Sequence, residues 1–186
     1  MQKYDPIEGG LAGAILASRP QLPDPNFSEA LVYLVEQDKV GAFGLVMNRP
    51  LGKTLSDVVA GTVGEGSLSG TKVYVGGPVQ TQQLLLAHFD QDEETRQIIC
   101  RVGLSEEQAE AYVANQQGWL RAFLGYSGWG EGQLEREIDE GTWRILRPDA
   151  SLFRTDFELG IWASYVGADQ RWRSLVRHIP EHPWMN

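Results

Sequence analysis

The chain has 186 residues, which suffices for one domain with a sizeable core and is too short for two ordinary domains without a visible linker. Hydrophobic residues make up 42% of it, but none of its apolar runs approaches the roughly 18 residues of a membrane span, so we expect a soluble protein. A net charge of −9 repels phosphate backbones and argues against direct nucleic-acid binding. Since the start lacks a secretory signal pattern and the single cysteine cannot form an internal disulfide, we predict a cytoplasmic location.

The first third of the chain predicts three strands. Small and aliphatic residues predict the first at 10–18, and the prolines that follow it predict a loop with a restricted backbone. Two further apolar runs, at 30–37 and 42–48, are separated by turn-forming residues at 38–41 and predict a hairpin.

The middle of the chain begins with a short helix. Thr54 precedes it, and Asp57 lies where a capping box requires an acceptor. The segment 61–70 is rich in Gly and Ser and predicts an exposed loop. Strands are predicted next at residues 72–79, 83–89 and 95–103, and the last two are joined by an exposed acidic turn. In the third, Ile98, Cys100 and Val102 alternate onto one face, which predicts that the thiol faces the core.

The last third mixes helices and strands. Ser105 begins a capping box for a helix to about Gln117, with Ala109, Tyr112 and Val113 facing inward and Gly118 ending it. A strand is predicted at 119–126, a short helix at 132–138, a strand at 142–146, and a capped helix from Thr155 to Gly167 that carries Phe157, Ile161, Trp162 and Tyr165. Because strands and helices do not alternate strictly, we predict an α+β fold around a mixed or antiparallel sheet.

One motif comes close to a hydrolase elbow. Gly125 and Ser127 fit the G-x-S-x-G pattern, but Trp129 stands where that strained turn requires glycine. Aspartates and histidines follow in the order of that fold, at Asp139, Asp149, Asp156, His178 and His182. Because the motif fails at a required position, we favour a tight glycine turn with a packed tryptophan, and a Ser127 hydrolase stays as an alternative.

Motifs for cofactors and metals also fail at required positions. Residues 47–54 end like a phosphate-binding loop, but Pro50 removes a backbone N–H, so Lys53 and Thr54 are better interpreted as the entry and cap of a helix. Glycines 128, 130 and 132 are too closely spaced for a dinucleotide site. Cys100 and His88 lack partners, Pro180 separates His178 from His182, and Thr95 replaces the glycine of a calcium loop. We therefore expect neither a cofactor nor a metal.

Polar and aromatic residues in stiff loops are the remaining candidates for function. An arginine fork can bind a carboxylate or phosphate, and an aromatic ring can stack on a flat group. The candidate ligand or partner cleft comprises Asp24, Asn26, Asn48, Arg49, Tyr126 and Trp129. The residues that shape the backbone around it are Pro25, Pro50, Gly76, Gly77, Pro78, Gly125 and Gly128. In the structural alternative, the polar groups satisfy their own loops, Arg49 pairs with a carboxylate, and the aromatic rings fill the core.

Four sequence stretches carry a family resemblance: LASRPQLPDPNF, GAFGLVMNRPLG, VGGPV and GYSGWGEGQLEREIDEGTW. Together they resemble the AlgH (YqgE) family of uncharacterised bacterial proteins, over about residues 10–167. The resemblance implies a single α+β domain with a barrel-like, branched sheet surrounded by helices. The family is labelled a transcriptional regulator through an association with alginate production, without an established DNA-binding module, activity or cofactor. Its members commonly have alanine at the position of Ser127, which a nucleophile would not tolerate.

The tail at 168–186 departs from this resemblance. Trp172, Leu175, Val176 and Ile179 predict a short amphipathic helix at 169–179 with arginines nearby, which would dock on its own domain or contact a partner. For the whole chain we favour a non-enzymatic binding or regulatory domain with a protein or small-molecule partner. The alternatives are a transcriptional regulator that acts through a protein partner, and an enzyme with an unrecognised active site.

Overall fold

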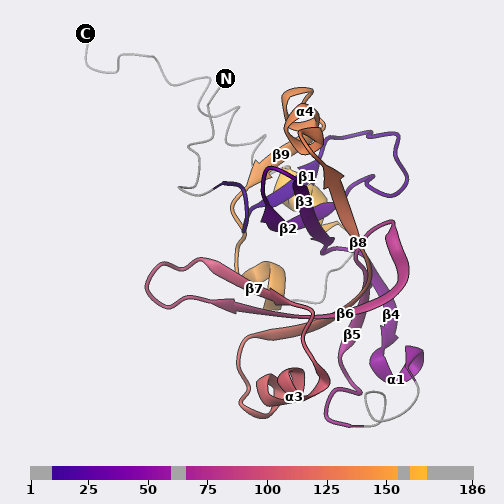
Figure 1. The fold of residues 1–186 in the computed structure, drawn as a ribbon, viewed down its shortest axis with the longest axis vertical. Helices are drawn as coiled ribbons and strands as arrows, with labels where there is room; N and C mark the ends of the chain where they lie inside the picture. Colours follow the sequence, from indigo (N-terminus) through magenta and orange to yellow (C-terminus); the bar gives the residue numbers. More distant parts are fainter. Residues whose placement is uncertain (1–9, 60–65, 155–159, 167–186) are drawn as a thin grey trace.

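The computed structural model describes residues 10–59, 66–154 and 160–166, which form one mixed sheet of nine strands with short helices around it (Figure 1). The strands are β1 (Ile15–Ser18), β2 (Leu31–Gln37), β3 (Gly41–Val46), β4 (Pro50–Thr54), β5 (Lys72–Val75), β6 (Val79–Gln91), β7 (Ile98–Val102), β8 (Trp119–Gly130) and β9 (Trp143–Leu146). The labelled helices are α1 (Leu55–Val58), α3 (Glu106–Ala114), α4 (Gln133–Asp139) and α5 (Ser151–Arg154), and residues 161–166 are also helical.

The long strand β8 joins the two halves of the sheet. Its first part pairs with β5 in parallel and with β6 antiparallel, and its last residues pair antiparallel with β3. The strand order is β4-β5-β8-β3-β2-β1-β9, and β6 and β7 branch away from β8. Figure 1 shows β1, β2, β3, β9 and α4 in the upper half and β4 to β7 with α1 and α3 in the lower half. The predicted α+β class and branched, mixed sheet are confirmed, but the sheet is open, with β4 and β9 at its ends, instead of closed into a barrel.

Short polar signals begin and end the elements as the sequence predicts. In the β2–β3 turn, Asp38 Oδ1 accepts hydrogen bonds from the amides of Val40 (2.7 Å) and Gly41 (3.0 Å). Before α1, the amide of Thr54 donates to Asp57 Oδ2 (2.8 Å). The α3 capping box forms between Ser105 and Gln108. These side chains satisfy backbone groups that would otherwise lack partners, so the predicted hairpin and both capping boxes are confirmed.

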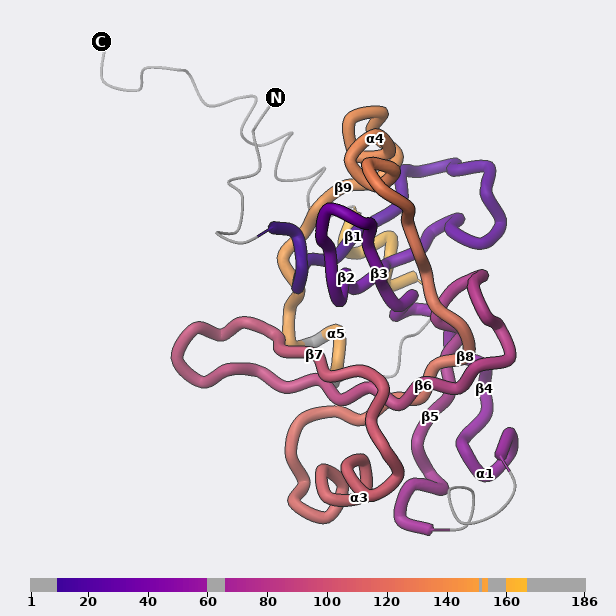
Figure 2. Tube along the Cα trace, in the orientation of Figure 1, coloured from indigo at the N-terminus to yellow at the C-terminus, as the bar shows by residue number. Residues whose placement is uncertain are grey.

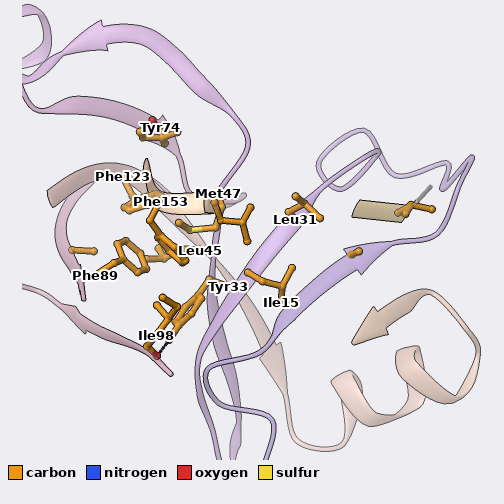
Figure 3. Close-up of a cluster of buried hydrophobic side chains, with 14 residues drawn as sticks. Ile15, Leu31, Tyr33, Leu45, Met47, Tyr74, Phe89, Ile98, Phe123 and Phe153 are labelled. Atoms are coloured by element: carbon orange, nitrogen blue, oxygen red, sulfur yellow. Dashed lines mark hydrogen bonds between the residues drawn. The ribbon is translucent and has the colours of Figure 1, made fainter. Parts of the chain in front are cut away.

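The largest buried cluster lies where the two halves meet, and Figure 3 shows its aromatic side chains converging. Tyr33 of β2 packs edge-on against Phe89 of β6, with ring centroids 5.5 Å apart, and its hydroxyl donates to the Ile98 carbonyl of β7 (2.9 Å). Phe123 of β8 and Phe153 of α5 complete this contact between the halves. Burying side chains of this size stabilises the fold by about 1.5–3 kcal/mol each.

Several predicted boundaries are wrong. The first strand begins at Ile15, because Gly10 and Gly13 have positive φ angles outside the extended region. Helix α3 ends at Ala114, before Gly118, and Val113 is 37% exposed, so Ala109 is its only fully buried residue.

Other predictions lie wholly or partly outside the described residues. These are the 61–70 loop up to residue 65, the capping box of Thr155 with Phe157, the C-terminal helix at 169–179, and both C-terminal histidines. Within the described part, Ile161, Trp162 and Tyr165 pack against the large cluster, as their spacing predicts.

Candidate functional site

The loop between β1 and β2, residues 19–30, contains the first two candidate residues. Asp24 accepts the amide of Asn26 on its carboxylate (2.8 Å), and its carbonyl accepts the amide of Ser28 (2.8 Å). The 19–30 loop is therefore folded on itself by an Asx turn, which satisfies the Asp24 side chain locally. Asn26 is exposed on the outer side of this turn.

Asn48, in the short connection between β3 and β4, holds this loop in place. Asn48 accepts the amide of Leu31 on Oδ1 (2.9 Å) and donates through Nδ2 to the carbonyl of Glu29 (2.8 Å). Glu29 has a φ of 52°, a left-handed conformation that is unfavourable for a residue with a side chain, so its neighbours must stabilise it. Asn48 thus fixes the point where the loop enters β2.

Arg49 holds the middle of the same loop. Its Nη2 donates to the carbonyl of Ser28 (2.7 Å) and its Nη1 to the carbonyl of Pro25 (3.3 Å). The guanidinium fork therefore bridges two backbone carbonyls, whereas the sequence suggested a carboxylate partner. Asp24, Asn26, Asn48 and Arg49 come together at this loop, and most of their polar atoms stabilise its conformation.

The two aromatic candidates lie in different clusters. Trp129 is 6% exposed, packs against Phe27 of the 19–30 loop at 6.3 Å between ring centroids, and donates from Nε1 to Glu137 Oε2 (2.9 Å). Tyr126 instead contacts Phe43 at 5.0 Å and packs against the large cluster. Trp129 therefore supports the 19–30 loop from its core side, through Phe27, whereas Tyr126 belongs to a different part of the core.

The GYSGW segment is a strand, and the predicted glycine turn is wrong. Residues 125–130 continue β8, where Ser127 pairs with Gly44 and Gly130 with Gly41 of β3. The turn interpretation failed because glycine is needed here for another reason, namely that two backbone segments lie in close contact. A Cβ on Gly125 would lie 2.6 Å from the carbonyl oxygen of Gly77. We call the site where Gly76 and Gly77 cross residues 125–127 the β8 crossing.

Ser127 lies inside the β8 crossing. Its side chain is fully buried, and its hydroxyl donates to the carbonyl of Gly76 (3.2 Å). The same carbonyl accepts the amide of Val46 (2.8 Å). A hydrolase elbow presents its serine to substrate, so this buried hydroxyl does not have the geometry of that motif.

Three titratable side chains outside these loops, Cys100, His88 and Asp92, make contacts that indicate structural roles. Burial raises the pKa of the Cys100 thiol to about 12, which keeps it protonated and poorly reactive at neutral pH. His88 is fully buried, stacks on Tyr112 at 3.7 Å between ring centroids, and has Nε2 2.9 Å from the carbonyl of Gln117. In the acidic hairpin, hydrogen bonds from Thr95 lower the pKa of Asp92. Across the described ranges, no three His, Cys, Asp or Glu side chains are arranged to hold a metal ion.

One pocket is a feature that the sequence did not predict. It has a volume of about 310 Å³ and lies on β4 and β5, directly after Arg49. Its lining residues are Pro50, Gly52, Lys53, Thr54, Lys72, Val73 and Tyr74. The only sequence signal for it was the segment that resembles a phosphate-binding loop. Separately, none of the helices in the described part has the length and apolarity needed to cross a membrane.

Comparisons with known proteins give consistent matches. A sequence model of the AlgH-like family (DUF179) matches residues 15–183. A UPF0301 protein of Streptomyces avermitilis is 31% identical over 95% of both chains, and one of Hahella chejuensis is 37% identical over 78% of this chain and 82% of its own. The solution structure of the AlgH protein from Pseudomonas aeruginosa has a TM-score of 0.63 and 27% identity, over 98% of this chain and 100% of that one. The crystal structure of protein DIP2367 from Corynebacterium diphtheriae, 19% identical over 89% of this chain and 88% of that one, shares the fold with a TM-score of 0.69.

Proposed function

The chain belongs to the AlgH-like family, and we propose that it is a non-enzymatic binding domain whose preformed 19–30 loop contacts a protein partner. The observation that carries this proposal is the way in which the loop is held. Asn48 and Arg49 donate three hydrogen bonds to carbonyls of this segment, which has neither helix nor strand of its own, and Asn48 accepts a fourth from the amide of Leu31 at the start of β2. A loop ordered before binding loses less conformational entropy when its partner arrives.

The outer side of the loop has the chemistry of a polar contact surface. Pro25, Asn26, Ser28 and Glu29 are exposed, while Phe27 packs inward against Trp129 and Trp143. Figure 2 shows the loop near α4, whose residue Glu137 accepts the indole N–H groups of both tryptophans. The exposed amide, hydroxyl and carboxylate provide donors and acceptors on a rigid base, which suits a hydrogen-bonding protein surface.

In this proposal the six candidate residues have different roles. Asn26 contacts the partner directly, whereas Asp24, Asn48, Arg49 and Trp129 position the loop. Tyr126 packs in another cluster and is not needed for this surface. A regulatory action through a protein partner and a cytoplasmic location are parts of the same proposal.

Site-specific photocross-linking tests this assignment. A photoreactive phenylalanine analogue at position 26 should capture one discrete partner in cells, and the same analogue at the exposed Glu107 of α3 should not. Adding Arg49→Ala should reduce the cross-link at position 26, because the carbonyls of Pro25 and Ser28 lose their donor. Identical products at both positions, or a cross-link that Arg49→Ala leaves unchanged, would contradict the proposal.

The hydrolase alternative has its own test. A serine-directed phosphonate probe should leave the folded protein unlabelled, because the Ser127 hydroxyl is fully buried. Labelling that Ser127→Ala abolishes would show that the serine is reached by substrates and that the protein is an enzyme.

A further inference from the structure

We propose that the outer edge of β7 binds an extended, basic segment of a protein partner, which joins the sheet there as a further antiparallel strand. This edge lies in the lower half of the molecule in Figure 1, whereas the 19–30 loop lies in the upper half, so the two surfaces are separate. Figure 1 also shows the hairpin of β6 and β7 extending away from the rest of the fold. Three features of β7 support the proposal: its backbone groups, its lack of edge protection and the charge around it.

The hydrogen bonds at the two ends of this hairpin show which backbone groups of β7 point toward β6. The amide of Asp92 donates to the carbonyl of Gln97 (2.9 Å), and the amide of Gly103 donates to the carbonyl of Leu86 (3.0 Å). In an antiparallel ladder, hydrogen-bonded pairs alternate with pairs that share no hydrogen bond. Between the two ends, the residues of β7 that bond to β6 are therefore Ile99 and Arg101.

The alternate residues Ile98, Cys100 and Val102 direct their amides and carbonyls away from β6. The Ile98 carbonyl accepts the hydroxyl of Tyr33 (2.9 Å), which holds the start of β7 against the core. Within the described residues, the outward amides and carbonyls of Cys100 and Val102 have no hydrogen-bond partner, and β6 is the strand that runs alongside β7. An extended segment added to a sheet edge pairs with groups of this kind.

β7 lacks the features that protect the two ends of the sheet, β4 and β9. β4 begins with Pro50 and has a register shift before Lys53, and β9 has only four residues, with Pro148 soon after it. Prolines, irregular pairing and short length all discourage the pairing of an edge with another chain. In contrast, β7 contains no proline and pairs with β6 over five consecutive residues without a register shift. Its edge is therefore regular enough to receive another strand.

The two faces of β7 define which side chains suit the added strand. Cys100 and Val102 pack against the large buried cluster, so apolar side chains suit the continuation of that face. On the opposite face Ile99 is 38% exposed and Arg101 is also exposed, so polar side chains suit the continuation of this one. Because successive residues of a strand point to opposite faces, the partner segment should alternate apolar and polar residues.

The charge around β7 indicates that these polar residues are basic. Residues 79–117, which comprise β6, β7, α3 and their connections, contain seven acidic side chains and two arginines, so about a fifth of the chain carries −5 of its net charge of −9. The acidic residues are Asp90, Asp92, Glu93, Glu94, Glu106, Glu107 and Glu110. A basic segment is attracted to such a surface. A second copy of the chain carries the same acidic residues, so like charges oppose the pairing of two β7 edges.

An NMR titration of the full ¹⁵N-labelled chain tests this edge, with an acetylated heptapeptide amide in which valine and lysine alternate as the probe. The peptide should produce saturable shifts of the Cys100 and Val102 amides and slow their hydrogen exchange. The same peptide with glutamate in place of lysine should bind about fivefold more weakly or less. The absence of saturable shifts at about 1 mM peptide, or equal binding of the glutamate peptide, would overturn the proposal.

The free protein gives a further check. Slow exchange of the Cys100 and Val102 amides before any peptide is added would show that the edge is already covered. Shifts of these amides that depend on protein concentration would identify a second copy of the chain as the occupant. Either result would overturn the proposal.

N-methylated peptides test backbone pairing separately from charge. In an antiparallel addition, the valines lie opposite Cys100 and Val102 and share their apolar face, so the valine amides donate to β7 and the lysine amides point away from it. N-methylation of the valines should therefore abolish detectable binding, whereas N-methylation of the lysines should leave most of it. Equal binding of the two methylated peptides would show that the peptide does not bind as an antiparallel strand.

Glutamine variants of exposed glutamates provide matched controls for the charge. Glu93→Gln combined with Glu94→Gln, in the β6–β7 turn, should weaken binding of the lysine peptide about two- to fivefold. Glu131→Gln combined with Glu140→Gln changes the net charge equally, but these exposed residues flank α4 in the upper half, so binding should stay unchanged. Equal effects of the two double variants would show that only the overall charge attracts the peptide, which would overturn a site at β7. Cross-linking at position 26 is independent of these measurements.

Discussion

The β8 crossing and the 19–30 loop contain most of the distinctive sequence motifs, yet they are stabilised in different ways. At the crossing, backbone lies directly on backbone, and the Gly76 amide donates to the Leu124 carbonyl (2.8 Å). In the loop, side chains of Asn48 and Arg49 reach over to carbonyls of a segment that would otherwise lack partners. The crossing therefore has no space for any added atom, whereas the loop depends on particular donors and acceptors.

This difference separates the region that determines the fold, the β8 crossing, from the region that we propose binds a partner, the 19–30 loop. The crossing joins the two halves of the sheet, since β8 leaves β5 at Leu124 and meets β3 at Ser127. A rigid crossing of this kind fixes where β3 ends, and the short connection from β3 to β4 contains Asn48 and Arg49. The glycines of the β8 crossing thus position the polar residues Asn48 and Arg49, and of these two groups only the polar residues lie at the surface.

The largest expected effect is at Gly77. A Cβ there would overlap the carbonyl group of Tyr126, and Gly77 also has a φ of 153°. We expect Gly77→Ala to destabilise the protein by about 4 kcal/mol or more, or to prevent folding, because neither backbone can move independently. Urea denaturation followed by tryptophan fluorescence would measure this.

Gly128→Ala is the matched control within the same motif. Its Cβ would have its nearest contact at 3.4 Å, with the ring of Tyr126, and the strand conformation suits alanine. The free energy of unfolding should change by less than about 1 kcal/mol. Similar losses for both variants would show that glycine flexibility, and not the close crossing, explains the motif.

Asn48→Ala should have the next largest effect. It leaves the amide of Leu31 without its partner in a partly buried place, and the carbonyl of Glu29 without its partner at an exposed one. The expected cost is about 2 kcal/mol, and hydrogen exchange of the Leu31 amide should accelerate. Asn48→Asp keeps the acceptor for Leu31 but loses the donor to Glu29, so it should recover part of the loss. Unchanged exchange at Leu31 would show that the loop does not depend on this side chain.

The sequence predicted local features well because their signals are local. The capping boxes at Thr54 and Ser105 and the turn at Asp38 each depend on residues within three positions of one another. The β8 crossing could not be predicted in this way, because Gly77 and Tyr126 are far apart in the chain and their contact depends on the sheet order. The same applies to Arg49: its planar fork suggested a carboxylate, and only the fold shows that backbone carbonyls of the loop take that place. The pocket was missed because its lining residues lie on β4 and β5, whose pairing has a register shift between Pro50 and Lys53 that depends on contacts across the sheet.

Arg49→Ala should destabilise the loop less than Asn48→Ala does. Its two hydrogen bonds are exposed, with lengths of 2.7 and 3.3 Å, so we expect about 1 kcal/mol of lost stability. The change should be concentrated in the loop, as faster exchange of the Asn26 and Ser28 amides, with β2 still protected. Arg49→Lys should restore little, because one ammonium cannot reproduce a two-pronged contact. Global loss of protection would mean that the loop is a structural part of the core and not a surface held on top of it.

The smallest effect is expected at Ser127, although this residue lies at the centre of the crossing. Ser127→Ala removes one bond of 3.2 Å to the Gly76 carbonyl, which still accepts the Val46 amide at 2.8 Å. No buried acceptor is left without a partner, and alanine fits the same strand, so the free energy of unfolding should fall by only about 0.5–1 kcal/mol. Thermal and urea unfolding of the variant beside Gly77→Ala would measure the contrast. If Ser127→Ala cost as much as Asn48→Ala, the crossing would depend on a side chain as the loop does, and the distinction between the two regions would fail.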